Sequence, residues 1–69
     1  MKLITWNCNG AFRNKYHLFN EYDCDILIVQ ECENPLESTK AFNEWANNYQ
    51  WIGKNKNKGI GVFCKKYIK

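Results

Sequence analysis

The segment DILIVQEC, residues 25–32, decides how the fold is interpreted, because four consecutive aliphatic residues run directly into Gln30 and Glu31. A strand that is apolar on both faces is typical of the centre of a sheet covered on both sides, as parallel sheets are. The same change from apolar to polar occurs in KLITWNCNG, residues 2–10. Both strands are therefore expected to deliver polar groups to one end of a sheet.

The remaining segments predict an α/β fold in the order β-α-β-α-β-β. The predicted elements are strand 3–7, helix 12–22, strand 25–30, a helix from Asn34 to residues 47–48, and a hairpin of strands 49–53 and 60–64 around a basic loop, 54–59. Asp23 to Asp25 is predicted to close the first helix and open the next strand. The chain is short enough to form a single partial domain, residues 1–69.

Both helices are predicted from apolar spacing. In the first, Phe12, Tyr16, Phe19 and Tyr22 share one face. In the second, Asn34 is the expected N-cap, Pro35 takes the first position and Glu37 completes a capping box. The buried face of this second helix is expected to comprise Leu36, Phe42, Trp45 and Ala46.

The bulk composition narrows the class of protein. The net charge of +3 is compatible with an anionic ligand. The longest aliphatic run, Ile26 to Val29, is far too short to span a bilayer, and no signal-peptide pattern is visible. We therefore expect a soluble, cytoplasmic chain without a membrane partner. The four cysteines lack zinc-finger spacing and are expected to be reduced and mostly buried, although a zinc site stays open.

Two polar residues stand where the parallel strands end. Asn7 ends the first strand and Glu31 ends the second. In open α/β sheets, ligands bind beyond the carboxyl ends of the strands, so these side chains are expected to converge. A carboxylate beside a carboxamide is rich in oxygen and suits Mg²⁺ or Mn²⁺, which share oxygens with a substrate phosphate.

The succession ITWNCNG, DILIVQE and GIGVFCKK resembles the endonuclease/exonuclease/phosphatase superfamily, particularly its AP-endonuclease branch. The resemblance implies the N-terminal part of a four-layer α/β sandwich and hydrolysis of a phosphoester with a divalent metal. It implies that Asn7 holds the region of the scissile phosphate and that Glu31 binds the metal. Asn9 and Gln30 flank these positions and are expected to orient them.

Family motifs that the resemblance would place further along are missing from this sequence: a Tyr, an Asp-x-Asn pair and a final Asp-His pair. His17 lies in the first predicted helix, follows no catalytic pattern and receives no function. We therefore expect the N-terminal portion of such an enzyme, whether a natural truncation or a cloned or proteolytic fragment, to be inactive alone. The alternative function is a small basic binding module for nucleic acid or protein that catalyses nothing.

Simpler interpretations stay open for the same residues. Asn7 is also typical of a turn residue before Gly10, and Glu31 of a solvated strand end in an acidic patch with Glu33. The three tryptophans are expected to pack in the core, although tryptophans also stack on bases.

The expected partners are a phosphoester substrate and a second polypeptide surface. Lys54, Lys56 and Lys58 are candidate phosphate contacts that favour nucleic acid, although such a loop is also typical of a soluble hairpin tip. An apolar sheet face, drawn from residues such as Ile4, Trp6, Ile26 and Ile28, is expected to stay uncovered. The chain is therefore expected to self-associate or to pair with the missing remainder of the fold.

Overall fold

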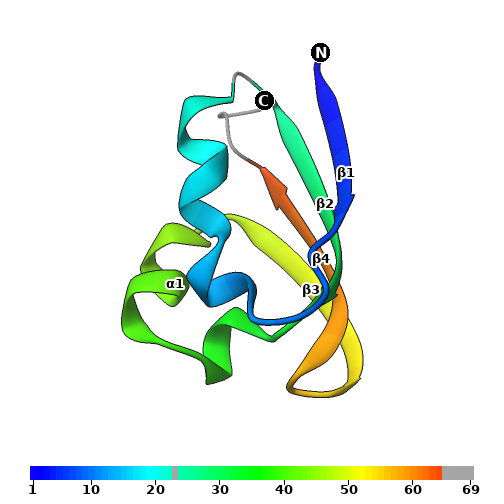
Figure 1. The fold of residues 1–69 in the computed structure, drawn as a ribbon, viewed down its shortest axis with the longest axis vertical. Coiled ribbons are helices and arrows are strands. Elements are labelled where there is room, and N and C mark those ends of the chain that lie inside the picture. Colours follow the sequence, from blue (N-terminus) through cyan, green and yellow to red (C-terminus); the bar gives the residue numbers. More distant parts are fainter. Residues whose placement is uncertain (23, 65–69) are drawn as a thin grey trace.

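Four strands form one mixed sheet in the order β1-β2-β4-β3 (Figure 1). The computed structural model describes residues 1–22 and 24–64, so the predicted junction at Asp23 and the residues 65–69 lie outside the described part. The strands are β1 (Leu3–Asn7), β2 (Ile26–Cys32), β3 (Tyr49–Asn55) and β4 (Lys58–Cys64). β1 is parallel to β2, whereas β4 is antiparallel to both β2 and β3. The predicted α/β class and the central position of β2 are confirmed.

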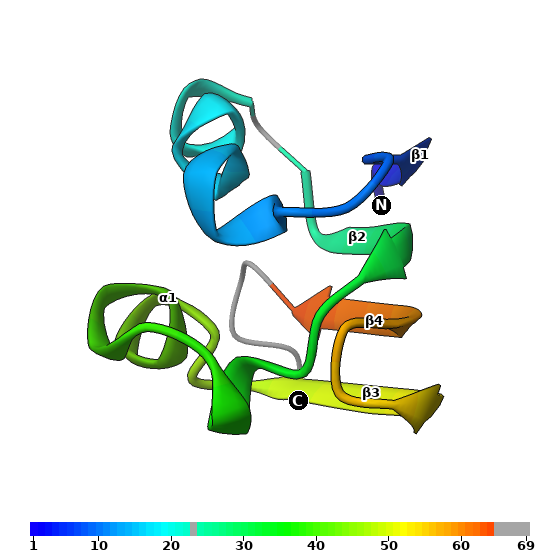
Figure 2. The ribbon, with the colours of Figure 1, turned by 60° about the horizontal axis from the view of Figure 1, so that its bottom comes forward.

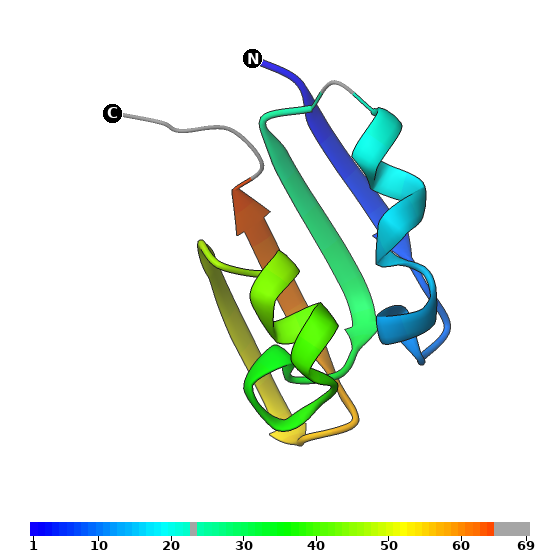
Figure 3. The same ribbon diagram turned by 90° about the vertical axis from the view of Figure 1, so that its left-hand side faces the viewer.

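Short helices cover one face of this sheet (Figures 2 and 3). They are η1 (Phe12–Asn14), η2 (Tyr16–Glu21), η3 (Pro35–Glu37) and α1 (Lys40–Trp45), of which only α1 is an α-helix. The core between the two layers is aromatic and aliphatic, and its largest fully buried side chains are Phe12, Phe42, Phe63, Leu27 and Val29. Trp6 joins this core, with its ring centroid 5.4 Å from that of Phe19.

The predicted helix at 12–22 is wrong in type, since the segment forms two 3₁₀ helices instead of one α-helix. The break falls at Lys15, whose φ of −127° and ψ of −17° are not helical. Its side chain turns back, and Nζ donates hydrogen bonds to the carbonyl oxygens of Cys8 at 2.6 Å and Gly10 at 2.9 Å. These contacts hold the chain away from continuous helical geometry.

The predicted second helix is also divided, at Ser38. Asn34 caps η3 as expected, with Oδ1 accepting from the Leu36 N–H at 3.1 Å. A second cap, Thr39, then starts α1. Leu36 is 73% exposed, so its predicted place on the buried face is wrong, whereas Phe42 and Ala46 are buried. The division turns η3 out of line with the apolar face of α1.

The basic hairpin is tighter than the sequence indicates. The strands extend to Asn55 and from Lys58, so only Lys56 and Asn57 separate them. Asn55 Oδ1 accepts from the N–H groups of Asn57 at 3.0 Å and Lys58 at 3.2 Å, which closes the turn. The predicted long loop at 54–59 is therefore wrong. The hydrogen bonds accepted by the Asn55 side chain close a turn of only two residues.

The other face of the sheet is covered by no helix among residues 1–22 and 24–64 (Figure 2). Ile26 and Ile28 lie on this outer face as expected and are half-buried, while Leu3, Ile52 and Ile60 are 57%, 74% and 46% exposed. The expectation that Ile4 and Trp6 share this face is wrong, because both pack against the core on the covered face. Within the described ranges no helix has the length and hydropathy of a membrane span. Cys8, Cys24 and Cys32 are buried, Cys64 is half-buried, and none of the four is paired in a disulfide, as predicted.

Candidate metal and phosphate site

The polar ends of β1 and β2 meet at one rim of the sheet. Asn7 lies beside Gln30 in the parallel register, one residue before Glu31. Asn7 Nδ2 donates a hydrogen bond to Glu31 Oε2 at 2.7 Å. The predicted convergence of Asn7 and Glu31 is therefore confirmed, although the roles of these residues stay predictions.

A β-bulge decides where Glu31 points. Leu27 and Val29 face the core, so strict alternation would turn the Glu31 side chain inward as well. Instead Glu31 has a φ of +56°, and it is the extra residue between Gln30, paired with Ile60, and Cys32, paired with Gly59. The bulge sends the carboxylate to the rim and returns Cys32 to the core.

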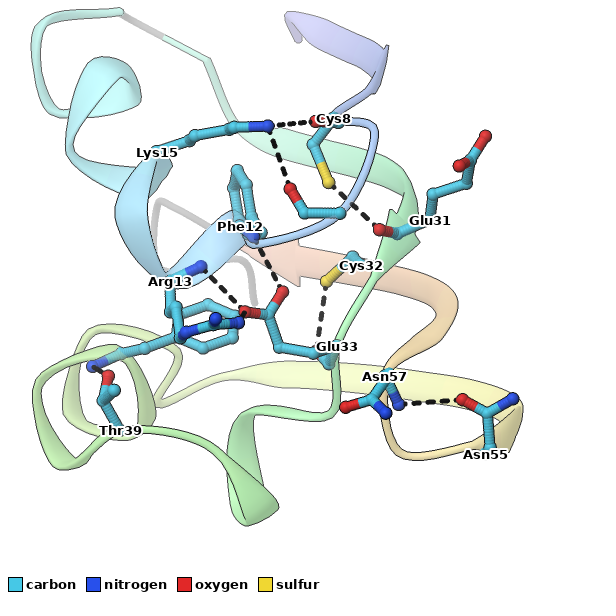
Figure 4. Close-up of polar contacts among 12 residues, drawn as sticks. Cys8, Phe12, Arg13, Lys15, Glu31, Cys32, Glu33, Thr39, Asn55 and Asn57 are labelled. Carbon is cyan, nitrogen blue, oxygen red and sulfur yellow. Dashed lines mark hydrogen bonds and ion pairs between the residues drawn. The ribbon is translucent and has the colours of Figure 1, made fainter.

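The loop after β1 is bonded to this bulge (Figure 4). Gly10 N–H donates to the Glu31 carbonyl oxygen at 3.0 Å, and Cys8 Sγ lies 3.3 Å from the same oxygen. Asn9, Gly10 and Ala11 all have positive φ, of 58°, 83° and 51°. Left-handed backbone is costly for Ala and Glu, so this rim stores conformational strain.

The charge on Glu31 is stabilised by its neighbours. The hydrogen bond from Asn7 is the main cause that lowers the pKa of the Glu31 carboxyl group, and the Lys58 ammonium adds to it. Lys58 Nζ lies 3.5 Å from Glu31 Oε1. Glu31 is therefore ionised at neutral pH, and each of its oxygens already faces a donor.

The other predicted site residues lie in several places. Asn9 contributes its backbone N–H, which donates to Asn7 Oδ1 at 3.0 Å and fixes the carboxamide. Gln30 Nε2 instead donates to Thr5 Oγ1 at 2.8 Å along the sheet. Of the three lysines, Lys58 reaches the rim. Exposed Lys54 lies near the end of β3, and Lys56 lines a separate groove of about 330 Å³ together with Arg13.

Glu33 is the residue that sequence reasoning misplaced. The acidic patch considered for Glu31 and Glu33 is wrong, because Glu33 is only 4% exposed. Its carboxylate accepts from the N–H groups of Phe12 at 2.8 Å and Arg13 at 3.0 Å, and from the Arg13 guanidinium at 3.0 Å (Figure 4). Burial raises its pKa, but these hydrogen bonds outweigh that effect and hold the pKa below its usual value.

The rim offers one carboxylate, so a divalent cation could be held there only as a largely hydrated ion. The described ranges hold no group of three or more His, Cys, Asp or Glu side chains that could cage a metal. One carboxylate is nonetheless compatible with Mg²⁺, which keeps several waters and takes further oxygens from a phosphate. Lys58 would have to leave Glu31 Oε1 or share it with the metal.

Comparison with protein-family models, curated proteins and solved structures finds no match to this chain.

Proposed function

We propose that this chain supplies the metal- and phosphate-binding part of a divalent-metal-dependent phosphodiesterase or nuclease. The observation that carries the proposal is the Asn7–Glu31 hydrogen bond of 2.7 Å at the ends of two adjacent parallel strands. A strained β-bulge and the lowered pKa of Glu31 support it, because both are common at functional sites.

Each residue at the rim has a distinct role in this proposal. Glu31 would hold Mg²⁺ or Mn²⁺, and Asn7, whose carboxamide is fixed by the Asn9 N–H, keeps the Glu31 carboxylate oriented. The bound cation would offset charge on the phosphate oxygens. Lys58 pairs with Glu31 at 3.5 Å and would be available to a phosphate oxygen if a cation were held by Glu31. No general base is assigned among these residues.

Direct metal binding tests the proposal without any need for turnover. We expect Mn²⁺, followed by the electron paramagnetic resonance signal of the free ion, to bind the chain weakly and to lose affinity at least tenfold in Glu31→Gln. Lys58→Ala should bind Mn²⁺ more tightly, because a competing cation is removed. Glu44→Gln, an exposed carboxylate on α1, is the matched control and should leave the affinity unchanged. Equal affinity in Glu31→Gln and the parent chain would rule out the site.

The alternative, a binding module for nucleic acid, is favoured by one observation. Lys54, Lys56 and Lys58 are all exposed on the hairpin, and Lys58 reaches the rim. Binding of a short single-stranded DNA that persists in EDTA and in Glu31→Gln would support this alternative. Binding that needs both Mn²⁺ and Glu31 would support the metal site, since electrostatic contacts alone require neither.

A further inference from the structure

β1 is an edge strand whose outer side pairs with no strand among residues 1–22 and 24–64. Its ladder to β2 uses alternate residues. The Lys2 carbonyl accepts from Ile26 N–H at 3.3 Å, and Cys8 N–H donates to the Gln30 carbonyl at 3.1 Å. Backbone groups of a strand alternate in direction, so the intervening odd-numbered residues, Leu3, Thr5 and Asn7, direct their N–H and C=O groups away from β2.

An apolar groove of about 680 Å³ runs along this same edge. Ile4 and Trp6 line it from the strand. η2 and the residue after it supply Leu18, Phe19 and Tyr22, with Glu21 as the charged residue of the lining. Leu18 is 51% exposed and Tyr22 is 59% exposed. An unpaired strand edge beside exposed apolar side chains is the arrangement to which another strand adds.

We propose that two copies of this chain pair through β1, antiparallel, about a two-fold axis at Thr5. In this register Thr5 faces Thr5 of the second copy and Leu3 faces its Asn7, and each pair exchanges backbone hydrogen bonds. Ile4 then lies opposite Trp6 of the second copy, over the groove. Thr–Thr pairs and pairs of an aromatic with a β-branched residue are both favourable across strands, so the strand is complementary to itself.

Charge selects β1 over the other edge of the sheet. Leu3–Asn7 contains no charged side chain, so the two paired strands bring no like charges together, although Glu21 lines the groove beside them. β3, at the opposite edge, carries Lys54 and leads into the turn that holds Lys56. Lysines at an edge oppose the addition of a second copy.

The area offered at the β1 edge is sufficient for a weak dimer. A Tyr side chain exposes about 150–250 Å² in full, so Tyr22 at 59% exposure offers roughly 100 Å². With Leu3, Leu18 and the backbone edge of five residues, each copy presents roughly 500 Å², near the lower limit of specific interfaces. We therefore look for the dimer at micromolar concentration and above.

Proline at position 5 tests the pairing, because it removes the outward N–H of Thr5 and keeps the ladder to β2. It also removes the hydroxyl that accepts from Gln30, so Thr5→Val, which retains the N–H, is the matched control. Sedimentation velocity at micromolar concentration should show a dimer for the parent chain and for Thr5→Val. Thr5→Pro should sediment as a monomer, with its fold checked by tryptophan fluorescence.

A second variant covers the case in which Thr5→Pro does not fold. Tyr22→Lys places a charge in the groove wall without touching the β1 ladder, and it should weaken the dimer at least tenfold. Ile52→Lys, on the outer sheet face, should leave the dimer intact. A monomeric parent chain would overturn the proposal. So would a dimer that tolerates Tyr22→Lys and dissociates in Ile52→Lys, since the outer face would then be the interface. None of these measurements involves metal, and every variant leaves Asn7 and Glu31 unchanged, so a failure of the dimer and a failure of the metal site can be told apart.

Discussion

Replacement of Glu33 by glutamine should remove much of the stability of the fold. The Glu33 carboxylate is 4% exposed and accepts two backbone N–H groups and the Arg13 guanidinium, at 2.8 to 3.0 Å. Glutamine keeps the shape but turns one oxygen into an NH₂ group. That NH₂ group would point at a donor, so either the Phe12 N–H or the Arg13 N–H and guanidinium would lose their acceptor.

The magnitude follows from the number of contacts. Hydrogen bonds to a charged group each contribute about 1.5–3 kcal/mol, and a buried donor left without a partner costs a similar amount. Loss of one or two such contacts gives a destabilisation of about 3 kcal/mol. A domain of this length typically has only about 3–10 kcal/mol of stability in total. Glu33→Gln should therefore remove between about a third and nearly all of the free energy of unfolding.

Urea titration followed by tryptophan fluorescence measures this change. Glu44→Gln, on the exposed side of α1, is the control and should alter the free energy of unfolding by less than about 0.5 kcal/mol. If the free energy of unfolding of Glu33→Gln also changed by less than this margin, the contacts of Glu33 with the start of η1 would not be what stabilises the fold.

The pH dependence of stability independently tests the contribution of the Glu33 carboxylate. The folded pKa of Glu33 lies below the ordinary value of 4.5, so its stabilisation is present above that pH and is lost as the pH falls through the folded pKa. The difference in stability between the parent chain and Glu33→Gln should therefore narrow below pH 4.5. A difference that stays constant on acidification would show that the charge is not what stabilises the fold.

Two further predictions concern the core. Gly61→Ala would place a Cβ 2.6 Å from the Phe63 ring, and such overpacking costs about 1–3 kcal/mol of stability. Calorimetry should show a melting temperature lower by roughly 5–20 °C. An unchanged melting temperature would contradict the close packing of Gly61 against Phe63. Burial raises the pKa of the Cys32 thiol to about 12 and also raises that of Cys8. Both thiols should resist alkylation at about pH 8 in the folded chain and react in denaturing urea, whereas half-buried Cys64 should react in the folded chain.

The sheet and the convergence of Asn7 with Glu31 could be predicted because they depend on simple geometry. Alternation of side chains placed Ile4 and Trp6 on one face, and parallel strands bring their carboxyl ends together. The route by which Glu31 reaches the rim was not predictable. A bulge at a glutamate with positive φ has no local sequence signal, and Glu lacks the backbone freedom that marks a glycine bulge.

Helix type was harder to predict for a similar reason. Apolar residues three or four apart suit both 3₁₀ and α geometry, so Phe12, Tyr16 and Phe19 could not distinguish between them. The break depends on Lys15 bonding to carbonyl oxygens five and seven residues earlier. Glu33 was missed because its partners lie 20 and 21 residues away, and proximity in sequence suggested a surface patch instead.

Glu33 and the candidate site at Asn7 and Glu31 are connected by a continuous series of contacts. Glu33 holds the backbone N–H groups of Phe12 and Arg13, which fixes the start of η1 directly after the strained Ala11. The loop before Ala11 bonds the bulge through the Gly10 N–H, and the bulge directs the Glu31 carboxylate to Asn7. Positive-φ residues of this kind persist only where surrounding contacts over-determine them, and the buried carboxylate provides such contacts. The two glutamates thus differ in role: buried Glu33 maintains the strained rim, and Glu31 presents its carboxylate at the rim, where Asn7 and Lys58 contact it.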